Sequence, residues 1–317
     1  MNELFDVSVL DASKITTYHG CDRLFLFQYL LGWQSIYTNH HLAFGTAYHI
    51  AMEVLWSAVP NVTADTAKEA VAAFQKSFDE LTNFDDADFW KAKTRENGEL
   101  AIMEYATKYY QDFRNYEVLL VERSGEIPVS EEMDMLVVKI DTIVRDNRDG
   151  LVYVVEHKTA GQKPVDIYDT RLQISGYYHA LNSCYGPKNV GGVIVDVAVL
   201  YKPGTPAGKK RIEATGTSNG FERFLVVKDG ATMMDGLYTI NAWIKKIKTA
   251  YAELIKTENP HCFPKKSENC YSYGGRCAFY DICSSSINPL TLTMPMNLKR
   301  KEWNPLLEFK KVENFKV

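Results

Sequence analysis

Three polar residues interrupt two apolar, β-branched runs in the middle of the chain. The runs cover residues 137–144 and 151–155, and the polar residues are Asp141, Glu156 and Lys158. Mg²⁺ and Mn²⁺ prefer oxygen ligands, and Mg²⁺ is usually held by one or two carboxylates together with a substrate phosphate. A neighbouring ammonium can stabilise the charge that develops on phosphorus during attack. These residue types therefore indicate metal-assisted hydrolysis of a phosphate ester.

The segment between the two runs, residues 146–150, has the composition of a turn, so a β-hairpin is expected. Alternate side chains of a strand point to the same face, which places Glu156 and Lys158 together. If the hairpin folds about Asn147 and Arg148, Asp141 lies opposite residues 154–155, close to Glu156. The alternative reading of an isolated D…ExK pattern is a structural ion pair at a sheet edge, and this pattern alone leaves both readings open.

Periodicity, caps and turn residues predict the elements around the hairpin. The chain opens with helices, continues with a strand-rich middle that one helix crosses, and then forms one long helix. This order indicates an α/β fold with a central mixed sheet flanked by helices. Helices are expected at 24–33, 42–56, 63–80, 96–115, 169–181 and 231–256, strands at 118–122, 193–201 and 221–227, and an exposed loop or hairpin tip at 202–220.

Three further side chains could complete a phosphate-cleaving site. His49, in the helix at 42–56, offers an imidazole, which suits Mn²⁺ better than Mg²⁺. Gln173 and Tyr177 lie one helical turn apart and could donate hydrogen bonds to phosphate oxygens. Taken singly, a histidine such as His49 is more often a satisfied core residue, and residues such as the other two more often form an ordinary exposed helix face.

Composition limits the class of protein. The chain has 317 residues, 46% of them hydrophobic, and a net charge of −4, so it does not have the global charge of a nucleic-acid-binding protein. Local basic runs occur at 209–211, 245–248 and 299–301, and each is more simply a solvated face. No apolar run reaches membrane-spanning length, so we expect a cytoplasmic protein with reduced cysteines and no membrane partner.

Taken in order, the candidate residues resemble the motifs of the RecB-like branch of the PD-(D/E)XK nuclease superfamily. The resemblance covers about residues 10–285, and it implies a restriction-endonuclease-like core that acts on DNA. Ile140 stands where the family name has proline, a departure common in this superfamily. The matching motifs are Gly45-x-x-x-His49, Asp141, Glu156-His157-Lys158 and Gln173-Ile174-Ser175-Gly176-Tyr177.

The resemblance implies a role for each matching residue. Two divalent ions, Mg²⁺ or Mn²⁺, are expected at one site, with Lys158 as the catalytic lysine. Gln173 and Tyr177 are expected to position DNA or brace the site. The implied metal ligands are His49, Asp141, Glu156 and the main-chain carbonyl of His157.

The cysteines give a second signal. Four of the six lie near the end of the chain, separated by seven, six and five residues, at Cys262, Cys270, Cys277 and Cys283. The absence of a CxxC pair counts against a zinc ribbon, whereas the ligands of an iron–sulfur cluster can come from distant parts of a sequence. Four free thiols in a loop remain the alternative. Cys184, in the helix at 169–181 or just after it, reads as a plain buried thiol.

AddB-type and CRISPR-adaptation nucleases are similar in this respect, since one N-terminal and three C-terminal cysteines hold a [4Fe–4S] cluster in them. The resemblance implies Cys21 as the N-terminal ligand, with Cys262 as an alternative to Cys270 in the C-terminal group. Such a tether closes a loop of more than 250 residues and would stabilise the fold mainly by restricting the unfolded chain. The implied C-terminal ligands are Cys270, Cys277 and Cys283.

The resemblance also implies a domain plan. A single nuclease domain is expected over residues 1–285, followed by a tail at 286–317. Within the domain we expect a helical part at 1–115, a sheet core at 116–230, and a long helix with the cysteine cluster at 231–285.

The expected function is that of a metal-dependent exonuclease acting on single-stranded DNA or DNA ends in recombination, repair or replication. The layout resembles a phage-like, stand-alone enzyme that works beside a recombination or replication protein, and its oligomeric state is open. Three alternatives are kept: a DNA-binding recombination-assembly subunit with weak or no nuclease activity, an endonuclease of the same superfamily, and a zinc-stabilised interaction module.

Overall fold

The structure is a computed structural model that describes residues 3–36, 39–82, 92–130, 134–161, 168–202, 204–272, 275–286 and 288–308. The chain divides into two compact units. We call the first the sheet unit, which comprises Thr38–Arg123 and Lys139–Asp229. The second, the cysteine unit, comprises Met1–Tyr37, Ser124–Val138 and Gly230–Lys316.

A mixed five-stranded sheet organises the chain, as the sequence predicted. Its order is β2-β3-β4-β5-β6. β3 and β4 are antiparallel, β4 and β5 parallel, and β5 and β6 antiparallel. The strands are β2 (Tyr116–Pro128), β3 (Met135–Asp146), β4 (Val152–Ala160), β5 (Val190–Val199) and β6 (Gly220–Val226).

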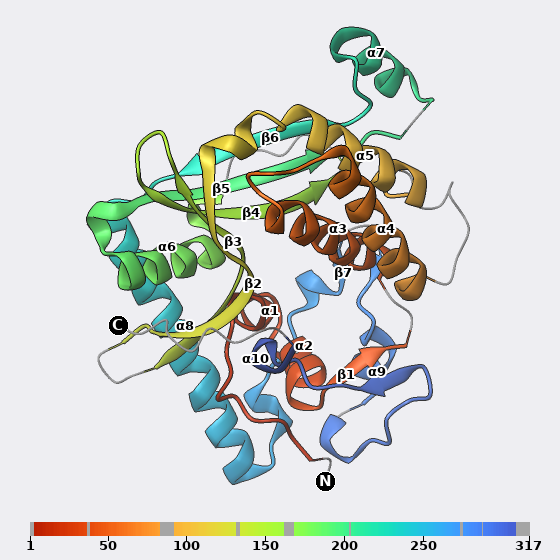
Figure 1. Ribbon diagram of the computed structural model, residues 1–317. Coiled ribbons are helices and arrows are strands. Elements are labelled where there is room, and N and C mark those ends of the chain that lie inside the picture. The colour runs from red at the N-terminus through yellow and green to blue at the C-terminus, as the bar shows by residue number, and fades with distance from the viewer. Residues whose placement is uncertain are drawn as a thin grey trace. The chain divides into compact units, whose positions relative to one another are not determined.

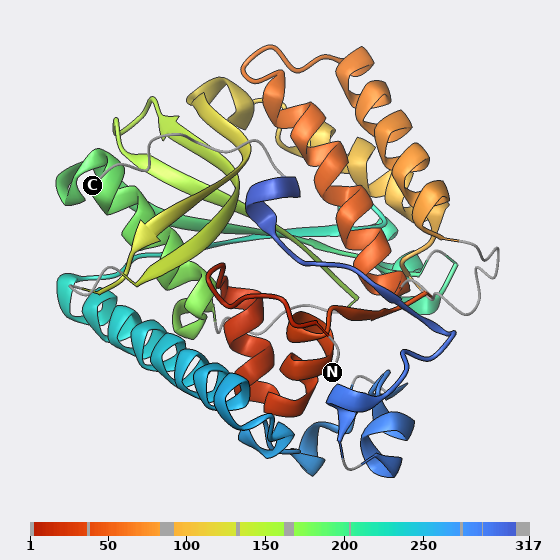
Figure 2. The ribbon, with the colours of Figure 1, turned by 90° about the horizontal axis from the view of Figure 1, so that it is seen from below.

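Helices cover both faces of the sheet in the sheet unit. α3 (His40–Ser57), α4 (Ala64–Leu81) and α5 (Arg95–Lys108) lie on one side, and α6 (Leu172–Tyr185) lies on the other, as Figures 1 and 2 show. Their core contains Phe44, Trp56, Phe74 and Phe113, all fully buried. Because truncating a buried ring such as Trp56 typically costs about 3–5 kcal/mol, this layer holds α3 firmly against the sheet.

The prediction of a loop at 202–220 was wrong, because the structure forms α7 (Pro206–Thr215) there. Thr205 caps this helix, its hydroxyl accepting a 3.2 Å hydrogen bond from the backbone N–H of Gly208. Pro206 occupies the first turn, and Gly216 ends the helix in the left-handed conformation with φ +73°. Proline and glycine were read as loop formers, although at these positions they are helix start and stop signals.

Other predicted elements differ at their ends. The expected helix at 24–33 is replaced by α2 (Asp22–Phe25), a π-helical turn (Leu26–Leu30) and β1 (Trp33–Ser35), with Gly32 at φ +66° between the last two. The strand expected at 118–122 is far longer, and the helix expected at 169–181 begins at Leu172. Short 3₁₀ turns lie at Asp112–Asn115, Tyr168–Thr170, Pro187–Asn189, Pro260–Cys262, Ser267–Asn269 and Pro289–Thr291.

The cysteine unit is built on α1 (Ala12–Gly20) and α8 (Gly230–Thr257), which pack together. Its C-terminal part returns to its N-terminal part: β9 (Leu298–Arg300) pairs with β1, and the Trp303 indole donates a 2.7 Å hydrogen bond to Asp11. The remaining elements are β7 (Tyr271–Ser272), β8 (Gly275–Arg276), α9 (Tyr280–Ser285) and α10 (Pro305–Glu308). Among the helices that the structure describes, none has the length and apolarity needed to cross a bilayer.

Candidate metal centre and cysteine pocket

The β3–β4 hairpin places the two predicted carboxylates, Asp141 and Glu156, at directly opposite positions of neighbouring strands. Thr142 pairs with Val155 and Ile143 with Val154, and continuing this register sets Asp141 opposite Glu156. The prediction that Asp141 lies opposite residues 154–155 was therefore wrong by one or two positions. The reason is the turn, which is centred between Arg148 and Asp149 rather than between Asn147 and Arg148, one residue later than predicted.

Asp141 is 4% exposed and is held by two partners. Its Oδ2 accepts a 2.9 Å hydrogen bond from the backbone N–H of His157. The same oxygen lies 3.2 Å from Nδ1 of His49, which α3 carries. The helix and the hairpin thus meet at one carboxylate, as the sequence motifs predicted.

Glu122 in β2 is a further acidic residue at this place, and sequence reasoning missed it. Its Oε1 lies 3.6 Å from Nδ1 of His49, and its Oε2 lies 3.0 Å from the ammonium of Lys139. Glu122 has φ +45°, a left-handed backbone conformation that is unusual for a non-glycine residue. Such outliers cluster at functional sites. The available signal was a carboxylate directly after the apolar run 118–121.

These three side chains form a candidate cation site. Within the part of the chain that the structure describes, they are the one group of three His, Cys, Asp or Glu residues whose ligand atoms all lie within 4.8 Å of one another. The group consists of His49, Glu122 and Asp141.

Glu156 and Lys158 lie next to this group on β4 and contact each other directly, as strand alternation predicted. Glu156 is 1% exposed, and its Oε2 has no hydrogen-bond partner among the described residues. A buried carboxylate oxygen without a partner is costly, so the chemistry of this oxygen fits a cation ligand. Burial alone would lower the pKa of Lys158, but the carboxylates of Glu156 and Asp141 together outweigh burial and raise that pKa.

Gln173 and Tyr177 of α6 do not form an exposed helix face. The amide of Gln173 donates to Glu156 at 3.0 Å and to the Tyr177 hydroxyl at 2.7 Å. The Tyr177 hydroxyl in turn donates to the carbonyl of Lys139. A continuous hydrogen-bonded chain therefore links α6, β4 and β3 around the carboxylate of Glu156.

Charges in this centre are strongly coupled. Burial by itself lowers the pKa of His49, but the carboxylates of Asp141 and Glu122 outweigh burial and raise that pKa to about 10. Burial would raise the pKa of Asp141, yet His49, together with His157 and Lys139, outweighs burial and lowers that pKa. Burial and the nearby Asp141 raise the pKa of Glu156. A divalent cation bound at Nδ1 would require the neutral imidazole, so metal binding and protonation of His49 would compete.

The backbone and the ring of His157 lie in different environments. The ring faces the opposite side of β4 from Glu156 and lies near Trp56 and Tyr105 in the helical layer. Burial lowers the pKa of this imidazole to about 4, so the ring is neutral at physiological pH. The ring therefore belongs to the core, which leaves only the main chain of His157 facing the carboxylates.

The sequence also matches a known protein family. The family model described as the PD-(D/E)XK nuclease superfamily matches residues 10–284. The chain belongs to this superfamily. No curated protein matches the chain. The mixed sheet flanked by helices is consistent with a restriction-endonuclease-like core, and membership in the superfamily implies a metal-dependent nuclease that acts on DNA.

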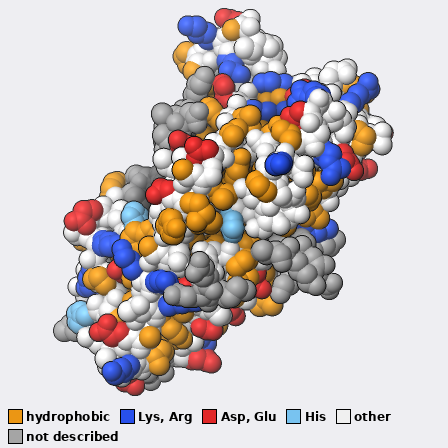
Figure 3. All heavy atoms as spheres, turned by 90° about the vertical axis from the view of Figure 1, so that its left-hand side faces the viewer, with side chains coloured by type: hydrophobic (Ala, Val, Ile, Leu, Met, Phe, Trp, Pro, Cys, Tyr) orange, Lys and Arg blue, Asp and Glu red, His pale blue; other side chains and the backbone are white. Residues whose placement is uncertain are grey.

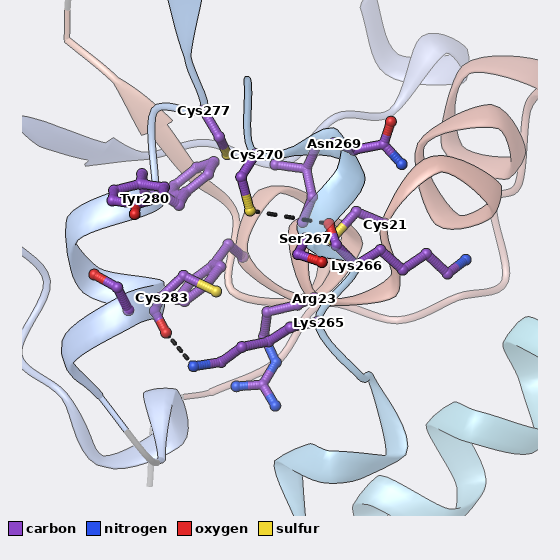
Figure 4. Close-up of a pocket in the computed structure, with 14 residues that line it drawn as sticks. Cys21, Arg23, Lys265, Lys266, Ser267, Asn269, Cys270, Cys277, Tyr280 and Cys283 are labelled. Atoms are coloured by element: carbon purple, nitrogen blue, oxygen red, sulfur yellow. Dashed lines mark hydrogen bonds between the residues drawn. The ribbon is translucent and has the colours of Figure 1, made fainter. Parts of the chain in front are cut away.

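The cysteine unit of this nuclease contains a pocket of about 120 Å³. Four cysteines line it, and Figure 4 shows their thiols turned toward a common space. Cys262 is not among the lining residues, and its sulfur lies 4.0 Å from the Thr257 hydroxyl. Cys184 belongs to the other unit and is half-buried in α6. The four lining cysteines are Cys21, Cys270, Cys277 and Cys283.

Basic side chains surround the same pocket. Arg23, Lys265 and Lys266 line it together with the cysteines. The Arg23 guanidinium is buried and donates to the carbonyls of Phe263 and Pro260 at 2.8 and 3.0 Å. Burial raises the pKa of Cys283, while Lys265 and Arg23 act to lower it. The charged ends of all three residues are engaged by the protein, since Lys265 donates to the carbonyl of Cys283 and Lys266 pairs with Asp22, but Lys265 and Arg23 lie close enough to Cys283 to act on its thiol.

Proposed function

We propose that this protein is a metal-dependent DNA exonuclease that acts on single-stranded DNA or DNA ends in recombination, repair or replication. The observation that carries the proposal is the convergence of His49, Glu122 and Asp141 beside the Glu156–Lys158 pair. Superfamily membership over residues 10–284 supports hydrolysis of phosphodiester bonds as the chemistry.

The donor set fits one or two divalent cations of the Mg²⁺ or Mn²⁺ type. Carboxylate oxygens suit both ions, and the single imidazole of His49 favours Mn²⁺. The orphaned Oε2 of Glu156 supports its inclusion as a further ligand. A bound divalent ion supplies Lewis-acid stabilisation of the phosphate and lowers the pKa of a bound water. The residues that would hold it are His49, Glu122, Asp141, Glu156 and the carbonyl of His157.

Lys158 and the α6 residues prepare the site for a phosphodiester. The Lys158 ammonium, held by Glu156 and lying 3.3 Å from Gln173, can stabilise negative charge that develops on the phosphoryl oxygens. Gln173 and Tyr177 fix the orientation of Glu156 through their hydrogen-bonded chain. In this role they position the catalytic carboxylate and need not touch DNA.

We further propose that Cys21, Cys270, Cys277 and Cys283 hold a [4Fe–4S] cluster. A tetrahedral zinc with bonds of about 2.3 Å requires sulfurs about 3.8 Å apart. No three cysteine sulfurs among the described residues lie within 4.8 Å of one another, which favours a larger occupant than one zinc ion. The cations around the pocket would offset the negative charge of a thiolate-bound cluster.

The experiment is digestion of linear DNA labelled at either end, in Mg²⁺ or Mn²⁺, with a covalently closed circle of single-stranded DNA as a second substrate. We expect the linear substrates to be shortened from an end and the circle to persist. Lys158→Ala and Asp141→Ala should abolish the activity. Digestion of the circle would indicate an endonuclease, binding without any digestion would indicate a DNA-binding subunit, and activity that survives both substitutions would refute this site.

A further inference from the structure

α7 contributes almost nothing to the core of the sheet unit. Of its ten residues, only Gly208 is buried, and the helix stands clear of the sheet in Figure 1. An isolated helix of this length is marginal in water. Its stability therefore rests on its caps, Thr205 and Gly216, rather than on packing. A helix maintained in this way presents its side chains to the surroundings.

The segment that carries α7 is basic, although the whole chain is acidic. Residues 202–220 contain four lysines and arginines and one glutamate, whereas the chain has a net charge of −4. Lys209 and Lys210 are exposed, and Figure 3 shows basic side chains gathered on this projection. Arg211 packs its guanidinium 5.3 Å from the Tyr201 ring. The charge is thus displayed on a protrusion of the sheet unit.

A buried polar network holds the base of the projection. The carboxylate of Glu104 accepts hydrogen bonds from the backbone N–H groups of Ser218 and Asn219 at 2.6 and 3.0 Å. The Asn219 amide also donates to Asn97 at 3.1 Å, and the Asn97 amide donates to the carbonyl of Tyr201 at 3.1 Å. Asn97 and Asn219 are fully buried. Both ends of the segment are therefore fixed to α5, so the projection has a defined root.

That root lies at the end of the strand that carries Lys158. In the β4–β5 register Lys158 pairs with Val197, and the backbone N–H of Leu200 donates to the carbonyl of Ala160 at 2.7 Å. Four residues lie between Val197 and Lys202, so the chain between them spans at most about 17 Å, the length of about five base pairs of duplex. Lys93 is not part of this path, because its ammonium lies 3.0 Å from the Thr159 hydroxyl, on the face of β4 opposite to Lys158. The C-terminal ends of β4 and β5 therefore lead from Lys158 to the base of α7.

We propose that α7 is an arm that binds the phosphate backbone of the DNA whose end is cut at the metal centre. This inference rests on the proposed nuclease function and names the element that holds the substrate away from the cut. Lys209 and Lys210 each contact one phosphate, and these contacts carry no sequence information. The arm thus provides a local basic surface for DNA binding on a protein whose net charge is negative.

The test is the salt dependence of DNA binding, measured by fluorescence anisotropy with labelled DNA of about 30 nucleotides in EDTA, over roughly 50–200 mM salt. Lys209→Ala/Lys210→Ala should weaken binding roughly tenfold and reduce the slope of log affinity against log salt by about 1.4 on single strands or 1.8 on duplex. The matched control is Lys68→Ala/Lys76→Ala in α4, which removes the same charge from exposed positions and should change the slope little.

An unchanged slope in the α7 variant, or an equal loss in the α4 control, would overturn the proposal. So would intact DNA binding combined with lost binding to an acidic polypeptide such as polyglutamate, because the arm would then serve a protein partner. Failure of this proposal can be told apart from failure of the proposed nuclease function. A wild-type protein that binds DNA through α7 but never cleaves it would refute the nuclease and retain the arm.

Discussion

The backbone N–H of His157 donates a 2.9 Å hydrogen bond to Oδ2 of Asp141. This bond fixes the acidic side chain of β3 against the main chain of β4, directly beside Glu156. His49 approaches the same oxygen at 3.2 Å, so Oδ1 of Asp141 takes no part in either contact. Two contacts therefore hold one oxygen of Asp141, and each member of the centre can be tested by its own substitution.

Asp141→Asn should remove the stabilisation that a divalent ion gives the folded protein. A ligand that binds only the folded state at 100 times its dissociation constant stabilises it by about 2.7 kcal/mol. We expect Mn²⁺ to raise the melting temperature of the wild type and to leave that of the variant unchanged. Thermal unfolding with Mn²⁺ and with EDTA checks this, and an equal rise in both proteins would place the ion elsewhere.

Glu122→Gln should weaken metal use without unfolding the protein. The amide keeps the shape of the side chain but removes the charge that faces His49 and Lys139. We expect the Mn²⁺ concentration for half-maximal nuclease activity to rise about tenfold or more. Glu117→Gln is the control, because Glu117 lies on the same strand but is exposed and pairs with Arg145. Equal metal requirements in both variants would exclude Glu122 from the centre.

The hairpin site was predictable and Glu122 was not, for a physical reason. Asp141, Glu156 and Lys158 interrupt apolar strands that are close in sequence, so alternation and one turn suffice to bring them together. Glu122 reaches the site through a left-handed backbone conformation on a strand whose length was underestimated. No periodicity in the sequence encodes that conformation, and the contact depends on tertiary structure.

The same distinction applies to the end of the chain and to α7. Sequence spacing left Cys262 and Cys270 as alternatives, and only the folded loops separate them, with Cys270 alone lining the pocket. α7 was missed because Pro206 and Gly216 were read as loop residues without regard to their places at the two ends of a helix. In both cases the relevant residue types were recognised in the sequence. Their positions in the fold decided which cysteine lines the pocket and whether the segment forms a helix.

Tyr177→Phe and Gln173→Ala should act on catalysis as one unit. Removing the Tyr177 hydroxyl takes away one of the two acceptors of the Gln173 amide, and removing Gln173 takes away a donor to Glu156, so either substitution loosens the same carboxylate. We expect each to lower kcat, and the double variant to lose less than the sum, with a coupling of about 0.5–3 kcal/mol. A double-mutant cycle in kcat measures this. Simple additivity would contradict the hydrogen-bonded chain.

Serine substitutions should sort the six cysteines into two groups. Replacing Cys21, Cys270, Cys277 or Cys283 should each abolish the brown colour and the bound iron of anaerobically purified protein. Cys262→Ser and Cys184→Ser are the matched controls and should keep both, because neither side chain lines the pocket. Absorbance near the cluster bands and iron analysis check this. A colourless wild type with stoichiometric zinc would contradict the cluster.

The most direct test of the metal centre is an anomalous difference map from crystals of the protein soaked in Mn²⁺. We predict a peak within about 2.1–2.3 Å of donor atoms from His49, Glu122 and Asp141, and its loss in Asp141→Asn crystals. A peak bound only by other residues, or density that persists unchanged in the variant, would contradict the account.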